Sequence, residues 1–176
     1  LFAFVGVLEP DGTVVDANEA PLKAAGITLA EVLGRKFWDC HWWNYDPEVR
    51  EQLREACQRA AQGETVRYDA VVRMAGDSRM SIDFQLAPLA NGEGRITHLI
   101  PSGVDITPRK EAERARSFMA AVVQSTEDAV VTKTLDGIIT SWNAGAERLF
   151  GYTPEEAIGQ PILLSLIHIS EPTRPY

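Results

Sequence analysis

Apolar and polar residues alternate in short runs over the first hundred positions, a pattern typical of β-strands with one buried face. The pattern predicts a β-hairpin over residues 2–17, turned at Pro10-Asp11-Gly12, because Pro presets φ and Gly admits a positive φ. Three further strands are predicted at about residues 66–74, 80–86 and 95–104. The second face of such strands is either exposed to water or covered by a partner.

Helical patterns separate the hairpin from these three strands. A short helix is predicted from Asn18, its candidate N-cap, to Ala25, with Gly26 as its stop. The capping box that begins at Thr28 predicts a second short helix, which ends at about Leu33.

The longest helix of this region is predicted to begin at Asp46 and Pro47, as N-cap and first helical residue, and to end at Ala61. Its apolar face has helical spacing and consists of Val49, Leu53, Ala56, Cys57 and Ala60. Hairpin, helices and strands together predict an α+β fold, in which helices cover one face of a five-stranded antiparallel sheet.

A shift of 125 residues, without gaps, aligns the turn, cap and breaker residues of this region with a later segment. The identities are Asp11-Gly12 with Asp136-Gly137, Asn18 with Asn143, Gly26 with Gly151, Thr28 with Thr153, Glu31 with Glu156, and Gly34 with Gly159. Such residues are retained where the backbone geometry requires them, so a second copy of the domain is predicted. The predicted organisation is a first domain over residues 1–107, a linker helix over 108–125, the N-terminal part of a second domain over 126–163, and a tail over 164–176.

The tail does not read as native protein sequence. Residues 164–174 resemble the translation of a sequencing-library adapter, all eleven residues in order. The alternative is a natural Leu/Ile strand followed by a Pro-containing segment. We exclude residues 164–176 from the reasoning on fold and function, and we expect the native termini to lie outside this chain.

The linker helix is predicted to begin at Pro108. Its small and apolar residues Ala112, Ala115, Met119 and Val122 lie at heptad spacing. Two interpretations stay open, a solvated linker helix and a parallel coiled-coil connector within a dimer, because two heptads do not decide between them.

Composition narrows the function classes. The chain has 176 residues, is 45% hydrophobic, and carries a formal net charge of −8, which argues against binding of nucleic acid or an anionic membrane. Two cysteines, Cys40 and Cys57, fit neither a disulfide framework nor a zinc site. No apolar run reaches the roughly 18 residues that span a bilayer, so a cytoplasmic location is expected, although a longer protein could carry a membrane anchor elsewhere.

This combination of residues resembles the PAS sensor domains that occur in tandem in bacterial sensor histidine kinases. The residues that carry the resemblance are Asp11-Gly12, Asn18, Gly26, Gly34, Trp42-Trp43 before Asp46-Pro47-Glu48, and the closing Gly103-Val104-Asp105-Ile106-Thr107. The second copy matches more closely, over Leu135-Asp136-Gly137-Ile138-Ile139 and from Ser141 to Tyr152.

The resemblance implies a sensor whose sheet packs against a partner and whose last strand leads into a signalling helix. In the family, an Asp-Ile-Thr triplet couples the sheet to that helix, and Asp105, Ile106 and Thr107 match this triplet. From the residues alone, Thr107 can also cap the helix that Pro108 begins, and the two roles are compatible.

Candidate binding chemistry centres on aromatic residues. Trp38, Trp42 and Trp43 either wall a small-molecule pocket or close the hydrophobic core beside the sheet, and we favour the core. Cys40 lies in the wrong register for the flavin–cysteinyl adduct of some PAS domains. His41 lies outside the longest helix, where haem-binding PAS domains place their ligand, so neither flavin nor haem is expected.

No catalytic or metal-binding constellation is expected, because the chain has no phosphate-cradling loop, phosphoacceptor His motif or ATP-binding lobe. The expected function is a sensory module of a two-component signalling protein. It senses a small ligand or partner and transmits through its C-terminal helix to a histidine kinase domain outside this chain. A homodimer through the sheet and linker helix is expected. The alternatives are a ligand-free dimerisation module and the sensor region of a diguanylate cyclase.

Overall fold

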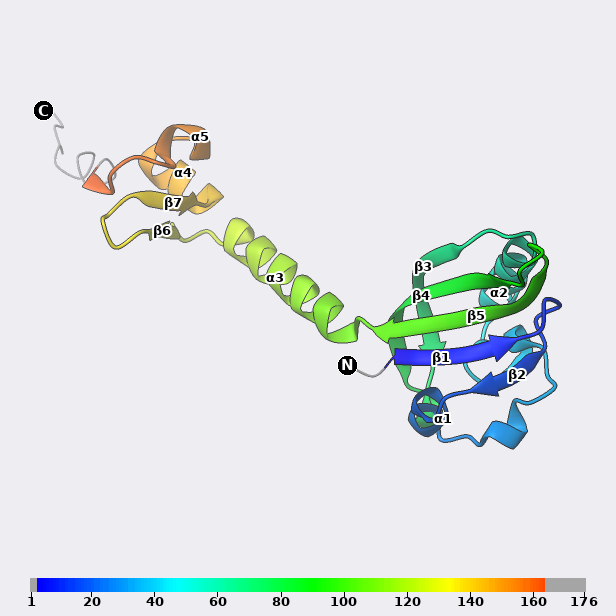
Figure 1. Ribbon diagram of the computed structural model, residues 1–176. Coiled ribbons are helices and arrows are strands. Elements are labelled where there is room, and N and C mark those ends of the chain that lie inside the picture. Colours follow the sequence, from blue (N-terminus) through cyan, green and yellow to red (C-terminus); the bar gives the residue numbers. More distant parts are fainter. Residues whose placement is uncertain (1–2, 164–176) are drawn as a thin grey trace, which may run out of the picture. The chain divides into compact units, whose positions relative to one another are not determined.

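The computed structural model describes residues 3–163 (Figure 1). The chain divides into two compact units at Glu111 and Ala112, and each unit is described by itself. The predicted tail, residues 164–176, lies outside the described residues.

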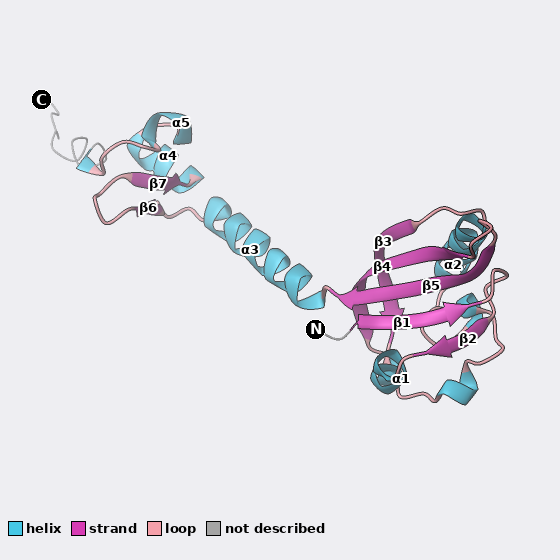
Figure 2. Cartoon of the chain, viewed as in Figure 1, coloured by secondary structure: helices cyan, strands magenta, loops and turns pink. Residues whose placement is uncertain are grey.

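The first unit is built on one five-stranded antiparallel sheet, with the strand order β2-β1-β5-β4-β3 (Figure 2). The strands are β1 (Ala3–Leu8), β2 (Val14–Ala17), β3 (Val66–Arg73), β4 (Arg79–Ala90) and β5 (Ile96–Asp105). The strand that comes last in the sequence is therefore central: Val104 of β5 pairs with Ala3 on one side and Asp83 on the other. This sheet confirms the predicted α+β class.

Two helices and three single turns complete the unit. The helices are α1 (Glu19–Ala25) and α2 (Pro47–Ala61), and the 3₁₀ turns are η1 (Leu29–Glu31), η2 (Phe37–Asp39) and η3 (Ala75–Asp77). Helix α2 begins where the sequence predicts, because the Asp46 carboxylate accepts a hydrogen bond from the Glu48 N–H at 2.8 Å. Its buried face, which includes Leu53, packs against β4 and β5 (Figure 2).

Asn18 does not cap α1 as predicted. Its side chain accepts from the Val5 N–H at 3.0 Å and donates to the Ala3 carbonyl at 2.9 Å, so it holds β1 instead. Pro21, three residues on, has no N–H and so removes one of the two backbone donors that such a cap could use. Its counterpart in the repeat is Ala146, whose N–H does donate to Asn143.

Two other sequence predictions differ from the structure in extent. The helix predicted after Thr28 is the single 3₁₀ turn η1, although the Glu31 carboxylate does accept from the Thr28 N–H at 2.7 Å. Strand β4 runs four residues beyond the predicted Leu86, to Ala90. Pro88 is tolerated there because β3 pairs with β4 only as far as Leu86, so β4 is an edge strand at that point.

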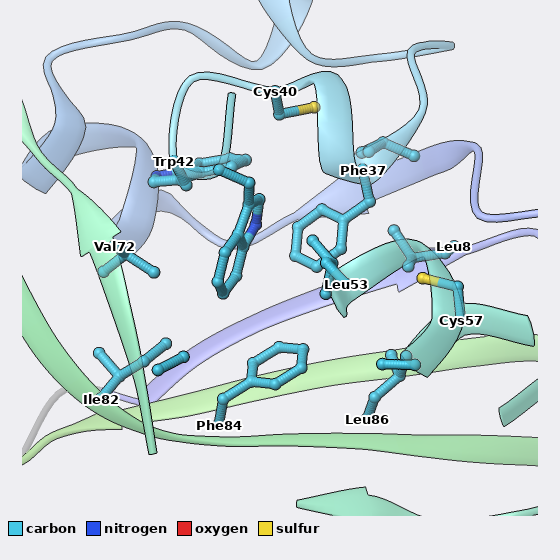
Figure 3. Packing of buried hydrophobic residues seen from close by; sticks show 14 of the residues in the cluster. Leu8, Phe37, Cys40, Trp42, Leu53, Cys57, Val72, Ile82, Phe84 and Leu86 are labelled. Atoms are coloured by element: carbon cyan, nitrogen blue, oxygen red, sulfur yellow. The ribbon is translucent and has the colours of Figure 1, made fainter. Parts of the chain in front are cut away.

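The core of the first unit lies between the sheet and the helical layer. Figure 3 shows Phe37 and Trp42, from the connector after η1, facing Ile82 and Phe84 of β4. The rings of Phe37 and Phe84 are stacked with centroids 6.5 Å apart. Leu53 is fully buried within the same cluster.

The second unit contains most of α3 (Thr107–Ser125), the hairpin of β6 (Val131–Lys133) and β7 (Ile139–Trp142), and the short helices α4 (Ala144–Phe150) and α5 (Pro154–Ala157). Its small core consists of Ile139, Trp142, Ala146 and Ala157.

The structure shows the predicted internal repeat in its backbone. The three aligned glycine pairs have left-handed φ values: 83° and 84° at Gly12 and Gly137, 68° and 79° at Gly26 and Gly151, 73° and 88° at Gly34 and Gly159. The isolated bridge between Thr13 and Lys36 also recurs 125 residues later, between Ile138 and Pro161. The second unit therefore repeats the opening of the first.

Candidate functional site

A cavity of about 50 Å³ lies within the first unit, between the sheet and the connector before α2. It is only partly enclosed, and its walls are almost wholly apolar. Residues that line it include Phe4, Phe37, Trp42, Trp43, Ile82 and Phe84.

Two glycines form part of the sheet floor of this cavity. Gly103 of β5 pairs with Phe4 on one side and Phe84 on the other, so a side chain there would stand between two aromatic rings. A Cβ at Gly103 would lie 2.9 Å from Cδ1 of Ile82. A Cβ at Gly6 would lie 3.2 Å from the ring of Pro101. The absence of a side chain at these two positions therefore lets Ile82 and Pro101 pack directly against the sheet floor.

The three tryptophans singled out from the sequence occupy different environments. Trp42 and Trp43 both line the cavity and both belong to the buried core. Trp38 is not among the lining residues; its ring covers Gly12, where a Cβ would lie only 2.4 Å away. The pocket interpretation therefore has a geometric basis for Trp42 and Trp43 but not for Trp38.

The two indole N–H groups of the cavity differ in their partners. Nε1 of Trp42 donates to the Pro21 carbonyl at 3.2 Å. Nε1 of Trp43 has no hydrogen-bond partner among residues 3–163, although the side chain is only 2% exposed. A buried donor without a partner is uncommon in folded proteins.

Neither cysteine can serve this cavity as a nucleophile. Burial raises the pKa of the Cys40 and Cys57 thiols to about 12, and neither residue lines the cavity. His41 does not line it either, and its Nε2 lies 3.3 Å from the Met74 carbonyl. The lining residues thus supply no imidazole for haem iron and no thiol for a flavin adduct.

The triplet Asp105, Ile106 and Thr107 lies where β5 ends and α3 begins. The Asp105 carboxylate accepts from the Thr107 N–H at 2.8 Å, so Asp105, rather than Thr107, supplies the side-chain cap. The Thr107 hydroxyl is engaged elsewhere: Oγ1 accepts from the Ser81 N–H at 2.9 Å. The Ile106 N–H donates to the Ser81 carbonyl at 2.9 Å. The start of α3 is therefore bound to β4.

A further contact joins the first turn of α3 to β3, the edge strand next to β4. Nζ of Lys110 lies 2.9 Å from Oδ2 of Asp69 on β3, and both side chains are partly exposed. The sequence pattern does not predict this ion pair, because its two residues are 41 positions apart in the chain.

Much of α3 offers apolar side chains that nothing within the described residues covers. Phe118 is 67% exposed, Met119 60% and Val122 45%. Within residues 3–163 there is no cluster of three metal-ligating side chains. No helix in that same range is long and apolar enough to cross a membrane.

Comparison with known proteins gives two family matches. A family profile described as PAS fold matches residues 2–111, and a second profile, also described as PAS fold, matches residues 117–174. The second match runs past Leu163 into the tail that we excluded.

Curated relatives at 31% and 35% identity are named histidine kinases and are much longer than this chain. Hybrid signal transduction histidine kinase D of Dictyostelium discoideum is 31% identical over 140 residues, which are 76% of this chain and 9% of that protein. Sensor histidine kinase TmoS of Ectopseudomonas mendocina is 35% identical over 115 residues, which are 64% of this chain and 12% of that protein. The chain thus spans about a tenth of the length of these relatives.

Among solved structures, an RNA-binding Light-Oxygen-Voltage receptor is similar, with a TM-score of 0.55 and 30% identity. The match covers 68% of this chain and 33% of that receptor.

Proposed function

The chain belongs to the PAS family, and from this premise we propose that it is a sensory module of a two-component signalling protein. In this proposal the module responds to a small ligand or partner and acts through α3 on a histidine kinase domain outside this chain. The relatives that are named histidine kinases support this output. The apolar cavity in the first unit supports the sensory role.

A single observation carries the proposed mechanism: of two adjacent residues of β4, one lines the cavity and the other is hydrogen-bonded to the start of α3. Ile82 lines the cavity, and Ser81, its neighbour, holds Ile106 and Thr107 at the start of α3. Because adjacent residues of a strand share one backbone, an occupant that displaces Ile82 also moves the hydrogen-bonding groups of Ser81. Binding then favours one of two packings of the α3 start, which is a shift in populations.

We propose that the module forms a homodimer through the sheet and α3. The exposed side chains of Met119 and Val122 lie at the heptad positions identified in the sequence, and a parallel partner helix would cover them. The proposed location is the cytoplasm, which the two free, buried cysteines support.

We also propose that the module acts without haem and without a flavin–cysteinyl adduct. The support is the lining of the cavity, to which His41, Cys40 and Cys57 do not contribute. The small volume favours an occupant far smaller than either cofactor.

A ligand-free dimerisation module is the second candidate, and the exposed apolar side chains of α3 favour it. The two candidates separate in a thermal-shift screen of the full chain against small metabolites, followed by hydrogen exchange. Sensing predicts that a stabilising compound changes the exchange of the Ser81 and Thr107 amides. A dimer that no compound stabilises would favour the structural role.

A further inference from the structure

Trp43 lines the cavity, and its Nε1 is the one buried side-chain N or O atom of residues 3–163 without a hydrogen-bond partner. Trp43 packs edge-on against Phe37 and Phe84, with ring centroids 5.5 and 5.3 Å away, so its neighbours are aromatic carbon. Nε1 finds no acceptor within the described part of the chain. Trp42 lines the same cavity with its own N–H bonded to Pro21, so the two indoles form an internal comparison.

The charge of the lining sets the class of occupant. The lining contains no Lys, Arg or His, so nothing within the walls would balance the charge of a carboxylate or phosphate. Asp16 and Ser102 have the only hydroxyl or carboxyl side chains of the lining. The Asp16 carboxylate is exposed and accepts from the Ala17 N–H at 2.8 Å. A neutral occupant fits these walls best.

The volume sets the size of the occupant. A cavity that holds benzene has a volume of about 150 Å³, roughly three times that found here. An occupant of about six non-hydrogen atoms must therefore use the open side of the cavity or displace a wall side chain. Ile82 is one of the wall residues, and its displacement is the step on which the proposed signal depends.

We propose that this cavity takes a small, neutral, mostly apolar molecule with a single hydrogen-bond acceptor, to which Nε1 of Trp43 donates. This inference rests on the proposed sensory function and specifies its ligand class. Trp43 is then a specificity-determining residue: it favours a ketone, ester or ether over a hydrocarbon of the same shape.

Two probes of equal shape test the inference. Cyclopentanone carries the acceptor, and methylenecyclopentane replaces the oxygen by carbon. Each is titrated into the full ¹⁵N-labelled chain, and the indole N–H resonances are followed. The variant Trp43→Phe removes the unpartnered donor, and the matched control Trp42→Phe removes a donor that already has a partner.

The inference predicts that cyclopentanone shifts the Trp43 indole proton downfield in a saturable manner. It also predicts that the ketone binds about fivefold more tightly than the alkene, because one neutral hydrogen bond is gained. This preference should vanish in Trp43→Phe and persist in Trp42→Phe.

Equal affinity for both probes, unchanged in Trp43→Phe, would overturn the role of Trp43 while the sensory function would stand. Absence of binding by either probe, with the Trp43 N–H in contact with a bound water, would overturn the ligand class. The sensory function itself is tested separately, by the thermal-shift screen and the exchange of the Ser81 amide.

Discussion

The hydroxyl of Thr107 is expected to hold the start of α3 on the sheet, and Thr107→Val removes it with almost no change of shape. In the native protein Oγ1 accepts from the Ser81 N–H at 2.9 Å and lies 3.4 Å from the Ser81 carbonyl as a donor. The carbonyl keeps a second donor, the Ile106 N–H at 2.9 Å. The N–H of Ser81 is therefore the group that the substitution leaves without its partner.

The expected cost follows from that orphaned group. A fully buried donor without an acceptor costs about 1–3 kcal/mol. Ser81 is only half-buried, so water offsets part of this cost and we expect about 1 kcal/mol. The same free energy should speed hydrogen exchange of the Ser81 amide about fivefold if it exchanges by local opening.

Urea unfolding followed by tryptophan fluorescence, together with hydrogen exchange, measures both quantities on the full chain. Thr107→Ser retains the hydroxyl and should stay close to the native protein. Thr97→Val is a second control, because that hydroxyl donates to the Leu89 carbonyl at an exposed site. If Thr107→Val matched Thr107→Ser in stability and in exchange at Ser81, the proposed attachment of α3 would be refuted.

Three further predictions concern the first unit. Gly12→Ala should cost about 1–3 kcal/mol more than Gly34→Ala in urea unfolding, because both have positive φ but only Gly12 has a tryptophan ring 2.4 Å from the added Cβ; equal losses would contradict this. Hydrogen bonds from Lys36, and after it from the side chain and N–H of Thr13, lower the pKa of the Asp11 carboxyl to about 2, so the stabilisation is present above about pH 4 and is lost as the pH falls through 2. Lys36→Met should reduce this pH-dependent difference, which stays below about 1 kcal/mol at an exposed pair, and urea midpoints from pH 5 to 2 measure the reduction. The two cysteine thiols, whose pKa burial raises to about 12, should resist alkylation by iodoacetamide at pH 8 until urea unfolds the chain, and rapid native labelling would contradict their burial.

Local chemistry made much of the fold predictable. Asp46 and Pro47 begin α2 where capping rules place them, because a cap involves only neighbours in the sequence. Gly12 and Gly137 have nearly equal φ for the same reason, since each turn is set within four residues. Hairpins, caps and the repeat depend on short-range contacts of this kind.

The cavity and the attachment of α3 depend on contacts that no local pattern reveals. Gly103 shapes the floor only because its neighbours in the sheet are Phe4 and Phe84, which come from distant strands. The hydroxyl of Thr107 reaches Ser81 only in one register of β4 against β5. Pro21 is a local exception: the sequence alone shows that its missing N–H removes one of the two backbone donors available to a cap by Asn18.

The central place of β5 has a consequence for how the domain is made on the ribosome. β1 and β2 form one ribbon and β3 and β4 another, and only β5 joins them, through pairs such as Ala3 with Val104. A nascent chain that ends before residue 96 holds two separate ribbons with unprotected edges. Closing the loop of about a hundred residues between Ala3 and Val104 is entropically costly, so we expect it to be the slow event of folding. The last strand of this unit to be synthesised covers the inner edges of both ribbons, and the helix that leaves the sheet starts two residues after it, at Thr107.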